Sequence, residues 1–393
     1  MKRTMALVLA LTVAAGGFAS GASAEETSKV THYVALGDSL TVGYEPDVFP
    51  GIDPMDMNYY GFADRVYEQS LYHGRTEYVN YGLAGMTSTG LMRFLQAVTE
   101  NRMTSVDEVQ PNLADPRGNL FGAMTSQVKE KLEQADLVTI TIGGNDFGNF
   151  QELIKGKSQD EITAMMEARL RAYQENASAI LKMIYALNPK VKVAIADQYN
   201  PVPPADPVQY AQLQIVMSSF TREVDSLVKQ FAGQGFSIVE AKVSQPFVGH
   251  ELDWTHIKGA DIHPNQAGYD VMAKVFSTAL WGSYQQPKGN GGMRIIVDGS
   301  ELETPYAPQV EQGTTYVPLR EYAEKLGVVV SWNDATKTAT ITENGRSVSY
   351  AIGAGAQLRY GGTKTYVPLR SLGEGLGLAV QYVRKSNLVF VNR

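Results

Sequence analysis

Strand-like and helix-like stretches alternate along residues 30–282, and this alternation restricts the fold more than any other feature. The strand candidates are short apolar or β-branched runs at 31–36, 77–81, 137–142, 191–196 and 236–239. Helix-like stretches separate or follow them at 60–71, 91–98, 125–134, 160–187, 210–231 and 266–280. Because such an order is typical of a parallel sheet covered on both faces, the sequence predicts an α/β domain over residues 28–284.

Composition and charge exclude several classes of function. The chain has a net charge of −7, which argues against nucleic acid as a partner because phosphate binding needs basic clusters. It has no cysteine, and therefore no disulfide, thiolate metal site or cysteine nucleophile. It also lacks a phosphate-cradling loop, a dinucleotide fingerprint and a His-Glu-x-x-His motif, so we expect neither a cofactor nor a metal.

Residues 1–24 have the pattern of a secretory signal peptide. Lys2 and Arg3 supply the positive end, an apolar core follows, and Ala22-Ser23-Ala24 is a small-residue cleavage site. The apolar core is too short to span a bilayer comfortably, and no later stretch reaches that length. We therefore expect a mature chain that begins near Glu25, has no transmembrane helix, and is secreted or associated with the cell surface.

The C-terminal part of the chain contains an internal repeat. The segment Thr315-Tyr-Val-Pro-Leu-Arg-Glu-Tyr-Ala-Glu-Lys-Leu-Gly327 recurs fifty residues later as Thr365-Tyr-Val-Pro-Leu-Arg-Ser-Leu-Gly-Glu-Gly-Leu-Gly377. Each copy predicts an extended piece, a short helix closed by glycine, and a strand. Since one copy could hardly bury its own apolar face, the two are expected to form one small α+β domain at 293–393. A flexible linker is expected at 285–292.

Polar blocks follow several of the predicted strands. Gly37-Asp38-Ser39-Leu40 follows the first strand, Gly82 to Gly85 the second, and Gly143-Gly144-Asn145-Asp146 the third. Asp261-Ile262-His263-Pro264-Asn265 precedes the last helix. An acyl-transfer serine enzyme needs a nucleophile, a base and oxyanion donors, and these residue types at one edge of a sheet could supply all three. Ser39 taken alone would favour a turn residue or a helix N-cap over a nucleophile.

Taken in order, these blocks resemble those of the SGNH hydrolases, also called the GDSL lipase/esterase family, over about two-thirds of the chain. The resemblance implies a three-layer α/β/α sandwich with a flavodoxin-like parallel sheet. It also implies that Ser39 is the nucleophile and His263 the base. The oxyanion hole would then consist of the Ser39 N–H, the Gly85 N–H and the Asn145 side chain.

One position departs from the family pattern. The family usually places an orienting Asp three residues before the histidine, where this chain has Ala260; Asp261 lies two residues before. Asp261, Asp253 or a backbone carbonyl could orient the His263 ring. His256, three residues after Asp253, is a rival base, but the Pro-Asn and Gly-Tyr that follow His263 favour His263.

The repeats resemble the copper amine oxidase N-terminal-like domain, through Val-Pro-Leu-Arg at 317–320 and 367–370. Residues 289–393 contain neither His nor Cys, the ligands that copper prefers, so the name implies no metal here.

The expected function of the whole chain is that of a secreted esterase or lipase that acts on a small-molecule or lipid ester. A polysaccharide O-acetylesterase, or a surface protein of weak catalytic activity, are the alternatives. The repeats would either bind a cell-wall polymer or serve as a spacer. Segments 45–58 and 100–122 are candidate loops beside a substrate cleft.

Overall fold

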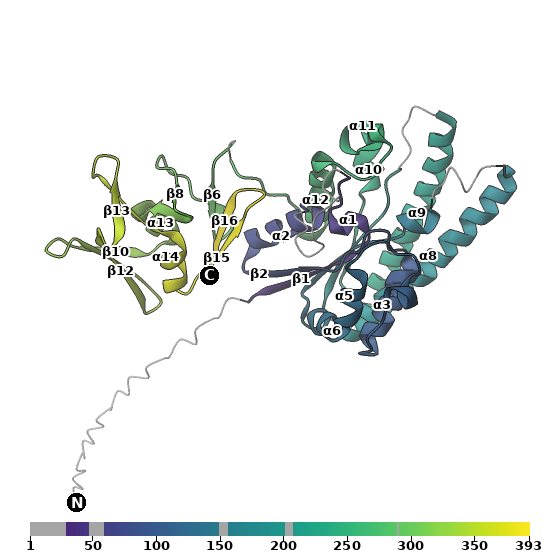
Figure 1. Ribbon diagram of the computed structural model, residues 1–393, viewed down its shortest axis with the longest axis horizontal. Helices are drawn as coiled ribbons and strands as arrows, with labels where there is room; N and C mark the ends of the chain where they lie inside the picture. Colours follow the sequence, from purple (N-terminus) through teal and green to yellow (C-terminus); the bar gives the residue numbers. More distant parts are fainter. Residues whose placement is uncertain (1–28, 47–58, 149–155, 201–206, 289–290) are drawn as a thin grey trace, which may run out of the picture.

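A parallel sheet of five strands forms the centre of the first domain (Figure 1). The computed structural model describes residues 29–46, 59–148, 156–200, 207–288 and 291–393. The strands have the order β2-β1-β3-β4-β5, and every pairing between them is parallel. Their bounds are β1 Thr31–Gly37, β2 Thr76–Asn80, β3 Leu137–Thr141, β4 Lys192–Ala196 and β5 Ile238–Ala241. This order confirms the predicted flavodoxin-like α/β fold.

Helices cover both faces of this sheet because both faces are apolar. Val34 and Leu36 of β1 pack in one core cluster with residues of α3, α6, α8 and α9. Tyr33 and Ala35 point to the other face, where α2 and α12 pack. The helices of this domain are α1 Ser39–Val42, α2 Phe62–His73, α3 Ser88–Thr99, α4 Val106–Val109, α5 Gly118–Ala123, α6 Thr125–Gln134, η1 Gly144–Phe147, α8 Gln159–Leu187, α9 Pro207–Gly233, α10 Ser244–Phe247, α11 Glu251–Trp254, η2 Ile257–Gly259 and α12 Gln266–Trp281.

The sheet order reverses between β1 and β3, and this reversal locates the site. β1 continues toward β2 on one side, whereas β3 continues toward β4 on the other. In open α/β sheets the crevice at such a switch point, outside the carboxyl ends of the strands, binds ligands. Ser39 follows β1 and Asn145 follows β3, so both lie at this crevice.

The second domain is a mixed β structure with two short helices. Its sheets have the orders β10-β11-β12-β13-β14-β9-β8 and β15-β16-β6-β7. The elements are β6 Arg294–Val297, β7 Ser300–Glu301, β8 Gln309–Glu311, β9 Thr314–Pro318, α13 Leu319–Leu326, β10 Val329–Asn333, β11 Thr338–Glu343, β12 Arg346–Ile352, β13 Gly355–Arg359, β14 Lys364–Pro368, α14 Leu369–Gly375, β15 Ala379–Val383 and β16 Leu388–Asn392.

The two sequence repeats are related by a local two-fold arrangement. The strands β9 and β14, one from each copy, pair antiparallel, and Val317 lies opposite its own counterpart Val367. Each copy then continues into a helix and an antiparallel hairpin, β10–β11 or β15–β16. Both helices contribute to one core, which confirms that the copies fold as a single unit.

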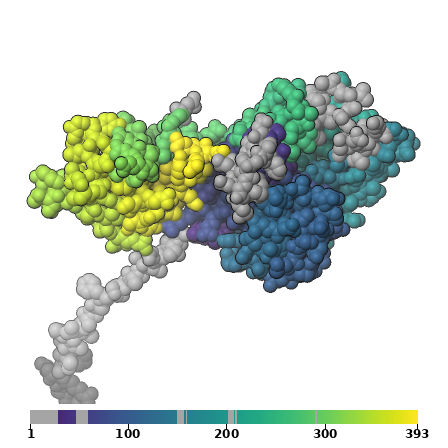
Figure 2. Space-filling model, viewed as in Figure 1, coloured from purple at the N-terminus to yellow at the C-terminus, as the bar shows by residue number. Residues whose placement is uncertain are grey.

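The second domain packs against α2 of the first. Leu71 and Tyr72 share an apolar cluster with Ile296, Leu388 and Phe390. The yellow C-terminal residues accordingly lie directly beside purple residues of the first domain (Figure 2). Gln285 at the start of the expected linker is also anchored, because its backbone N–H and carbonyl both bond the Gln69 side chain at 2.7 and 2.8 Å. The linker was predicted to be flexible, but its first residue is held and the domains are in contact.

Candidate active site

Ser39 occupies a tight turn between β1 and α1. Gly37 ends the strand with φ +142°, and a Cβ on it would lie 2.0 Å from the Thr141 carbonyl oxygen, so only glycine fits there. Asp38 caps α1 by accepting a hydrogen bond from the Leu40 N–H at 3.1 Å. Ser39 is the first residue of α1, where a backbone N–H has no acceptor within the helix.

A buried polar network lies beneath this turn. The Asp38 carboxylate also accepts from the Thr141 hydroxyl at 3.0 Å, and that hydroxyl lies 2.6 Å from the Thr41 hydroxyl. Burial raises the pKa of Asp38 to about 7, although the hydrogen bonds from Leu40 and Thr141 oppose the rise. The turn therefore rests on a carboxyl group that titrates near neutrality.

His263 lies between Ser39 and Asp261. Its Nε2 is 2.8 Å from the Ser39 Oγ, and its Nδ1 is 2.7 Å from Asp261 Oδ1. A carboxylate can only accept hydrogen bonds, so Nδ1 carries the proton and the neutral ring offers the Nε2 lone pair to the serine. The structure thus brings together the expected nucleophile and base, and of the groups that the sequence left open for orienting the ring it places Asp261 against Nδ1.

Asp261 reaches the ring through its backbone conformation. The same Oδ1 accepts from the His263 N–H at 2.8 Å, which is an Asx-type turn. Ala260 precedes it with φ +63°, a left-handed conformation that turns the chain there. This turn brings an Asp two residues before the histidine into contact with its Nδ1. The Asp253 carboxylate lies instead 3.6 Å from His250 Nδ1.

The surroundings of His263 favour its neutral form. Burial lowers the pKa of His263, the Asp261 carboxylate opposes this, and His256 lowers the pKa further. A neutral imidazole is the form that can accept a proton from a serine.

Asn145 lies beside the segment that carries Gly85. Its Nδ2 donates to the Met86 carbonyl at 2.9 Å. Gly85 has φ +83°, and its carbonyl accepts from Gln110 Nε2 at 2.9 Å. The Asp115 carboxylate accepts from the neighbouring Ala84 N–H at 2.8 Å. Segment 100–122, predicted to be a loop beside the cleft, therefore braces this turn and contains α4 and α5; segment 45–58 lies outside the described residues from 47 onward.

Ser39, Asn145 and His263 line one cavity of about 120 Å³. Gly85 is not among the described residues that line it. The remaining lining is largely apolar and comes from α1, η1, α9, the segment after β4 and the loop between η2 and α12: Leu40, Phe147, Tyr199, Leu213, Met217 and Ile262. Gln198 also lines the cavity, and its buried Nε2 has no hydrogen-bond partner among the described residues.

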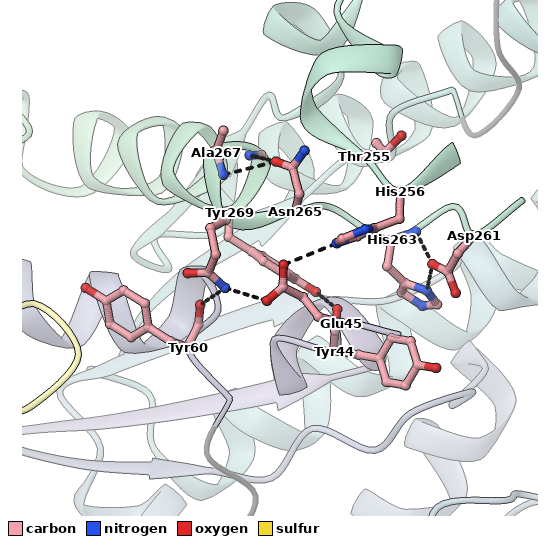
Figure 3. Close-up of polar contacts among 12 residues, drawn as sticks. Tyr44, Glu45, Tyr60, Thr255, His256, Asp261, His263, Asn265, Ala267 and Tyr269 are labelled. Atoms are coloured by element: carbon pink, nitrogen blue, oxygen red, sulfur yellow. Dashed lines mark hydrogen bonds and ion pairs between the residues drawn. The ribbon is translucent and has the colours of Figure 1, made fainter. Parts of the chain in front are cut away.

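Sequence reasoning missed two groups of residues around this site. Gln198 and Tyr199 follow β4, and the Tyr199 hydroxyl donates to the Ile262 carbonyl at 2.6 Å. The strand-end argument used for β1 and β3 would have found them. The second group is Glu45 with His256, whose side chains lie 3.2 Å apart (Figure 3). His256 had been considered only as a rival base.

The described residues contain neither a candidate metal cluster nor a candidate membrane-spanning helix. No group of three or more His, Cys, Asp or Glu side chains within them is arranged to hold a metal ion. None of their helices is long and apolar enough to cross a membrane. The predicted signal peptide at 1–24 lies outside this part of the chain.

Comparison with known proteins gives matches to both domains. The sequence model of the GDSL-like lipase/acylhydrolase family matches residues 35–271, and that of the copper amine oxidase N-terminal domain matches residues 296–361. The spore germination lipase LipC of Bacillus licheniformis is 26% identical over 254 residues, which cover 64% of this chain and 96% of LipC.

Solved structures resemble the first domain more distantly. The lipase Lip_vut3 from a goat rumen metagenome is 21% identical with a TM-score of 0.44, covering 63% of this chain and 97% of its own. The acetylxylan esterase Axe2 of Geobacillus stearothermophilus is 16% identical with a TM-score of 0.39, covering 65% and 96%.

Proposed function

Because the chain belongs to the GDSL-like lipase/acylhydrolase family, we propose that it hydrolyses carboxylic esters through an acyl-enzyme on Ser39, with His263 as base. The observation that carries this proposal is the chain of contacts from Ser39 Oγ through the His263 ring to Asp261, at 2.8 and 2.7 Å. A serine beside a base that a third group orients is the arrangement that nucleophilic catalysis requires.

The chemistry follows from these contacts. His263 Nε2 takes the hydroxyl proton as Ser39 Oγ attacks the ester carbonyl, and the same proton then passes to the departing alcohol. Water, activated by His263, releases the acid from Ser39. Asp261 holds the proton on Nδ1 and stabilises the charged ring during each transfer.

The developing oxyanion is assigned to three donors. These are the Ser39 N–H, the Asn145 amide and the Gly85 N–H. Loss of one such donor typically lowers turnover about 100- to 1,000-fold. Asn145→Ala should therefore leave the Ser39–His263 contact in place but lower turnover about 100- to 1,000-fold.

The cavity suits an acyl group with a hydrocarbon chain better than it suits an acetyl group. Leu213 and Met217 of α9, with Phe147, give apolar walls beside Ser39. Apolar walls favour a hydrocarbon acyl group over the acetyl group of a polysaccharide, and the similarity to a spore germination lipase supports the same choice.

Active-site labelling tests the mechanism. A fluorophosphonate should label the parent chain stoichiometrically at Ser39, and Ser39→Ala and His263→Ala should fold normally yet show no hydrolysis of a short-chain p-nitrophenyl ester. Asp261→Asn should lower kcat by about 1,000-fold or more, since it removes the carboxylate that fixes the ring. Near-parental turnover by Ser39→Ala would overturn the proposal. A parent chain that neither takes the label nor hydrolyses the ester would leave the surface-protein alternative.

Export is the second part of the proposal. Lys2, Arg3 and the Ala22-Ser23-Ala24 site support cleavage near Glu25 and release from the cell. N-terminal sequencing of the protein from the culture medium should give Glu25 or a neighbouring residue. An intact Met1 in the medium would contradict cleavage.

A groove in the second domain supports retention at a cell-wall polymer. It measures about 830 Å³ and lies beside α13, β10 and the turn before β14. Trp332, 48% exposed, lines it together with Arg320, Lys337 and Lys364. An exposed aromatic face with charged hydrogen-bonding groups around it suits a polysaccharide, whose rings have apolar faces and polar edges.

The pseudo-equivalent of Trp332 in the second copy provides a matched control. Tyr382 is 44% exposed but does not line the groove. Sedimentation with purified cell walls should retain the parent chain and Tyr382→Ala, whereas Trp332→Ala should bind at least about tenfold more weakly. Equal binding by all three would overturn the groove as the contact, and failure of the parent to bind would remove retention altogether.

A further inference from the structure

The two reacting side chains come from segments far apart in the chain. Ser39 and His263 are separated by 224 residues in the sequence. Their contact at 2.8 Å therefore requires that the two segments keep a fixed position relative to each other. Ser39 is in the turn after β1, whereas His263 lies between η2 and α12. Displacement of a reacting group by about 1 Å can cost about 100-fold in rate, so whatever ties these segments together bears on catalysis.

Glu45 connects the serine segment to the histidine segment. It follows the Ser39 turn directly, after Gly43 and Tyr44. One of its carboxylate oxygens lies 3.2 Å from His256 Nε2, and the other accepts from Gln266 Nε2 at 2.8 Å. Figure 3 shows the contact between the Glu45 carboxylate and the His256 ring. Because a carboxylate only accepts, His256 Nε2 carries a proton in this contact.

His256 is in turn joined to both catalytic members of its own loop. Its backbone N–H donates to the His263 carbonyl at 2.9 Å, and its carbonyl accepts from the Asp261 N–H at 3.4 Å. Its side chain therefore reaches the serine segment while its backbone holds the loop of the base. The His256 and Glu45 side chains are only 27% and 16% exposed, so water competes weakly for the contact.

Tyr44, the neighbour of Glu45, also contacts both the serine segment and the histidine. Its N–H donates to the Ser39 carbonyl at 3.0 Å, and its ring centroid lies 4.5 Å from that of His263. Its carbonyl accepts from the Tyr269 hydroxyl at 2.7 Å. A shift of Glu45 would thus move a ring that contacts the base.

We propose that Glu45 and His256 form a positioning pair that holds the His263–Asp261 loop against the Ser39 turn. The inference rests on the proposed Ser39–His263 chemistry and assigns neither residue a contact with substrate. It also assigns His256, which is not the base, the role of positioning the loop that carries the base.

The loop has other supports, so loss of the pair should affect orientation more than folding. The Tyr199 hydroxyl holds the Ile262 carbonyl, Thr255 pairs with Pro264 through a β-bridge, and the Asn265 N–H bonds the Trp254 carbonyl. None of these contacts involves the Glu45 side chain. Truncation of the pair is therefore expected to lower kcat at a nearly constant melting temperature.

Kinetics of single and double variants test the pair. His256→Ala and Glu45→Ala should each lower kcat by about 10- to 100-fold with little change in KM, and slow fluorophosphonate labelling to a similar extent. His256→Gln retains a donor near the Nε2 position and should recover most of the loss. The double variant should be no slower than the worse single variant, since either change alone removes the contact.

Matched controls separate the possible failures. His250→Ala removes an exposed histidine that stacks on Trp254 outside this network, and its kcat should remain at the parental value. Parental kcat in His256→Ala, or additive losses in the double variant, would overturn the positioning role. If Ser39→Ala were active, the proposed mechanism itself would fail; an inactive Ser39→Ala beside a fully active His256→Ala would remove this inference alone.

Discussion

Asp38 is the residue at which a folding requirement and an ionisable group coincide. Its carboxyl group caps the helix that begins with Ser39 and accepts from the Thr141 hydroxyl, yet it is fully buried in the first domain. Burial disfavours the charged form, so its pKa rises from 3.8 to about 7. A cap needs only an acceptor oxygen, which an amide also provides.

Asp38→Asn should stabilise the protein increasingly as the pH rises. In the parent, the folded state binds the Asp38 proton more tightly than the unfolded chain, so this group's contribution to stability is full below about pH 4 and is lost as the pH rises through about 7. Asparagine does not titrate, so the melting temperature of the variant relative to the parent should climb from pH 4.5 to pH 8. Thermal unfolding at several pH values measures this; an offset that is constant with pH would contradict it. Asp253→Asn, at an exposed carboxylate, is the control for charge.

The sequence indicated the serine and the histidine but could not choose the acid. Ser39 and His263 stand in blocks whose order is recognisable, and the structure brings the two side chains into contact. The contact of Asp261 with the ring depends on an Asx-type turn and on the left-handed backbone of Ala260, neither of which a residue pattern displays. Glu45 and His256 are 211 residues apart, and no local pattern links them. Their roles remain proposals that the variants above test.

At the scale of elements, the site depends on the end of β1, where the chain turns at Gly37 and leaves no room for a side chain. Gly37 and Gly74 have nearly the same φ, +142° and +146°, so alanine is strained at both. A Cβ at Gly37 would lie 2.0 Å from the Thr141 carbonyl oxygen, whereas one at Gly74 would meet nothing within 4 Å. Alanine substitutions at these two glycines therefore distinguish the cost of backbone strain from the cost of a steric clash with a neighbouring strand.

Gly74→Ala should cost about 1 kcal/mol of unfolding free energy, because only the backbone is strained. Gly37→Ala should cost at least about 3 kcal/mol, since β1 and β3 must also separate, and it should abolish labelling of Ser39. Urea unfolding and fluorophosphonate labelling measure the two effects. Equal losses of stability in the two variants would show that the close approach of the strands is unimportant.

Elements with a clear period were predicted from the sequence, whereas short ones were missed. The helix expected at 125–134 has those bounds as α6, because its apolar positions repeat along one face. The helices α4 and α5 lie in segment 100–122, where no period is visible. Such short helices depend on contacts with other segments rather than on their own pattern; the Val106 N–H of α4, for example, donates to the Asn119 side-chain oxygen of α5.

At the scale of the whole molecule, the repeat explains which copy meets the catalytic domain. Outward positions of β16 carry Leu388, Phe390 and Asn392, all buried, with Leu388 and Phe390 packed on Leu71 and Tyr72 of α2. The corresponding positions of β11, fifty residues earlier, carry Thr338, Thr340 and Thr342. Apolar side chains thus favour docking of the second copy. The first copy, with α13 and β10, extends away from the catalytic domain (Figure 1). This difference between the copies was visible in the sequence, but its meaning required knowing which strand face is outward.

The comparison of Asn392 with Thr342 tests whether the docked arrangement contributes to stability. Asn392 is 3% exposed, and its Nδ2 donates to the Leu71 and Gly74 carbonyls of the first domain at 2.9 and 3.1 Å. Asn392→Ala removes the donor to the buried Leu71 carbonyl and to the half-buried Gly74 carbonyl, and should cost about 1–3 kcal/mol. Thr342→Ala, at the equivalent exposed position of the first copy, should change stability by less than about 0.5 kcal/mol.

The urea midpoint for loss of esterase activity measures the effect of each substitution on stability. Since the family match at residues 35–271 and the proposed Ser39 site both lie in the first domain, a lower midpoint in Asn392→Ala would mean that the second domain stabilises the first. Equal midpoints would mean that the two domains touch without energetic consequence.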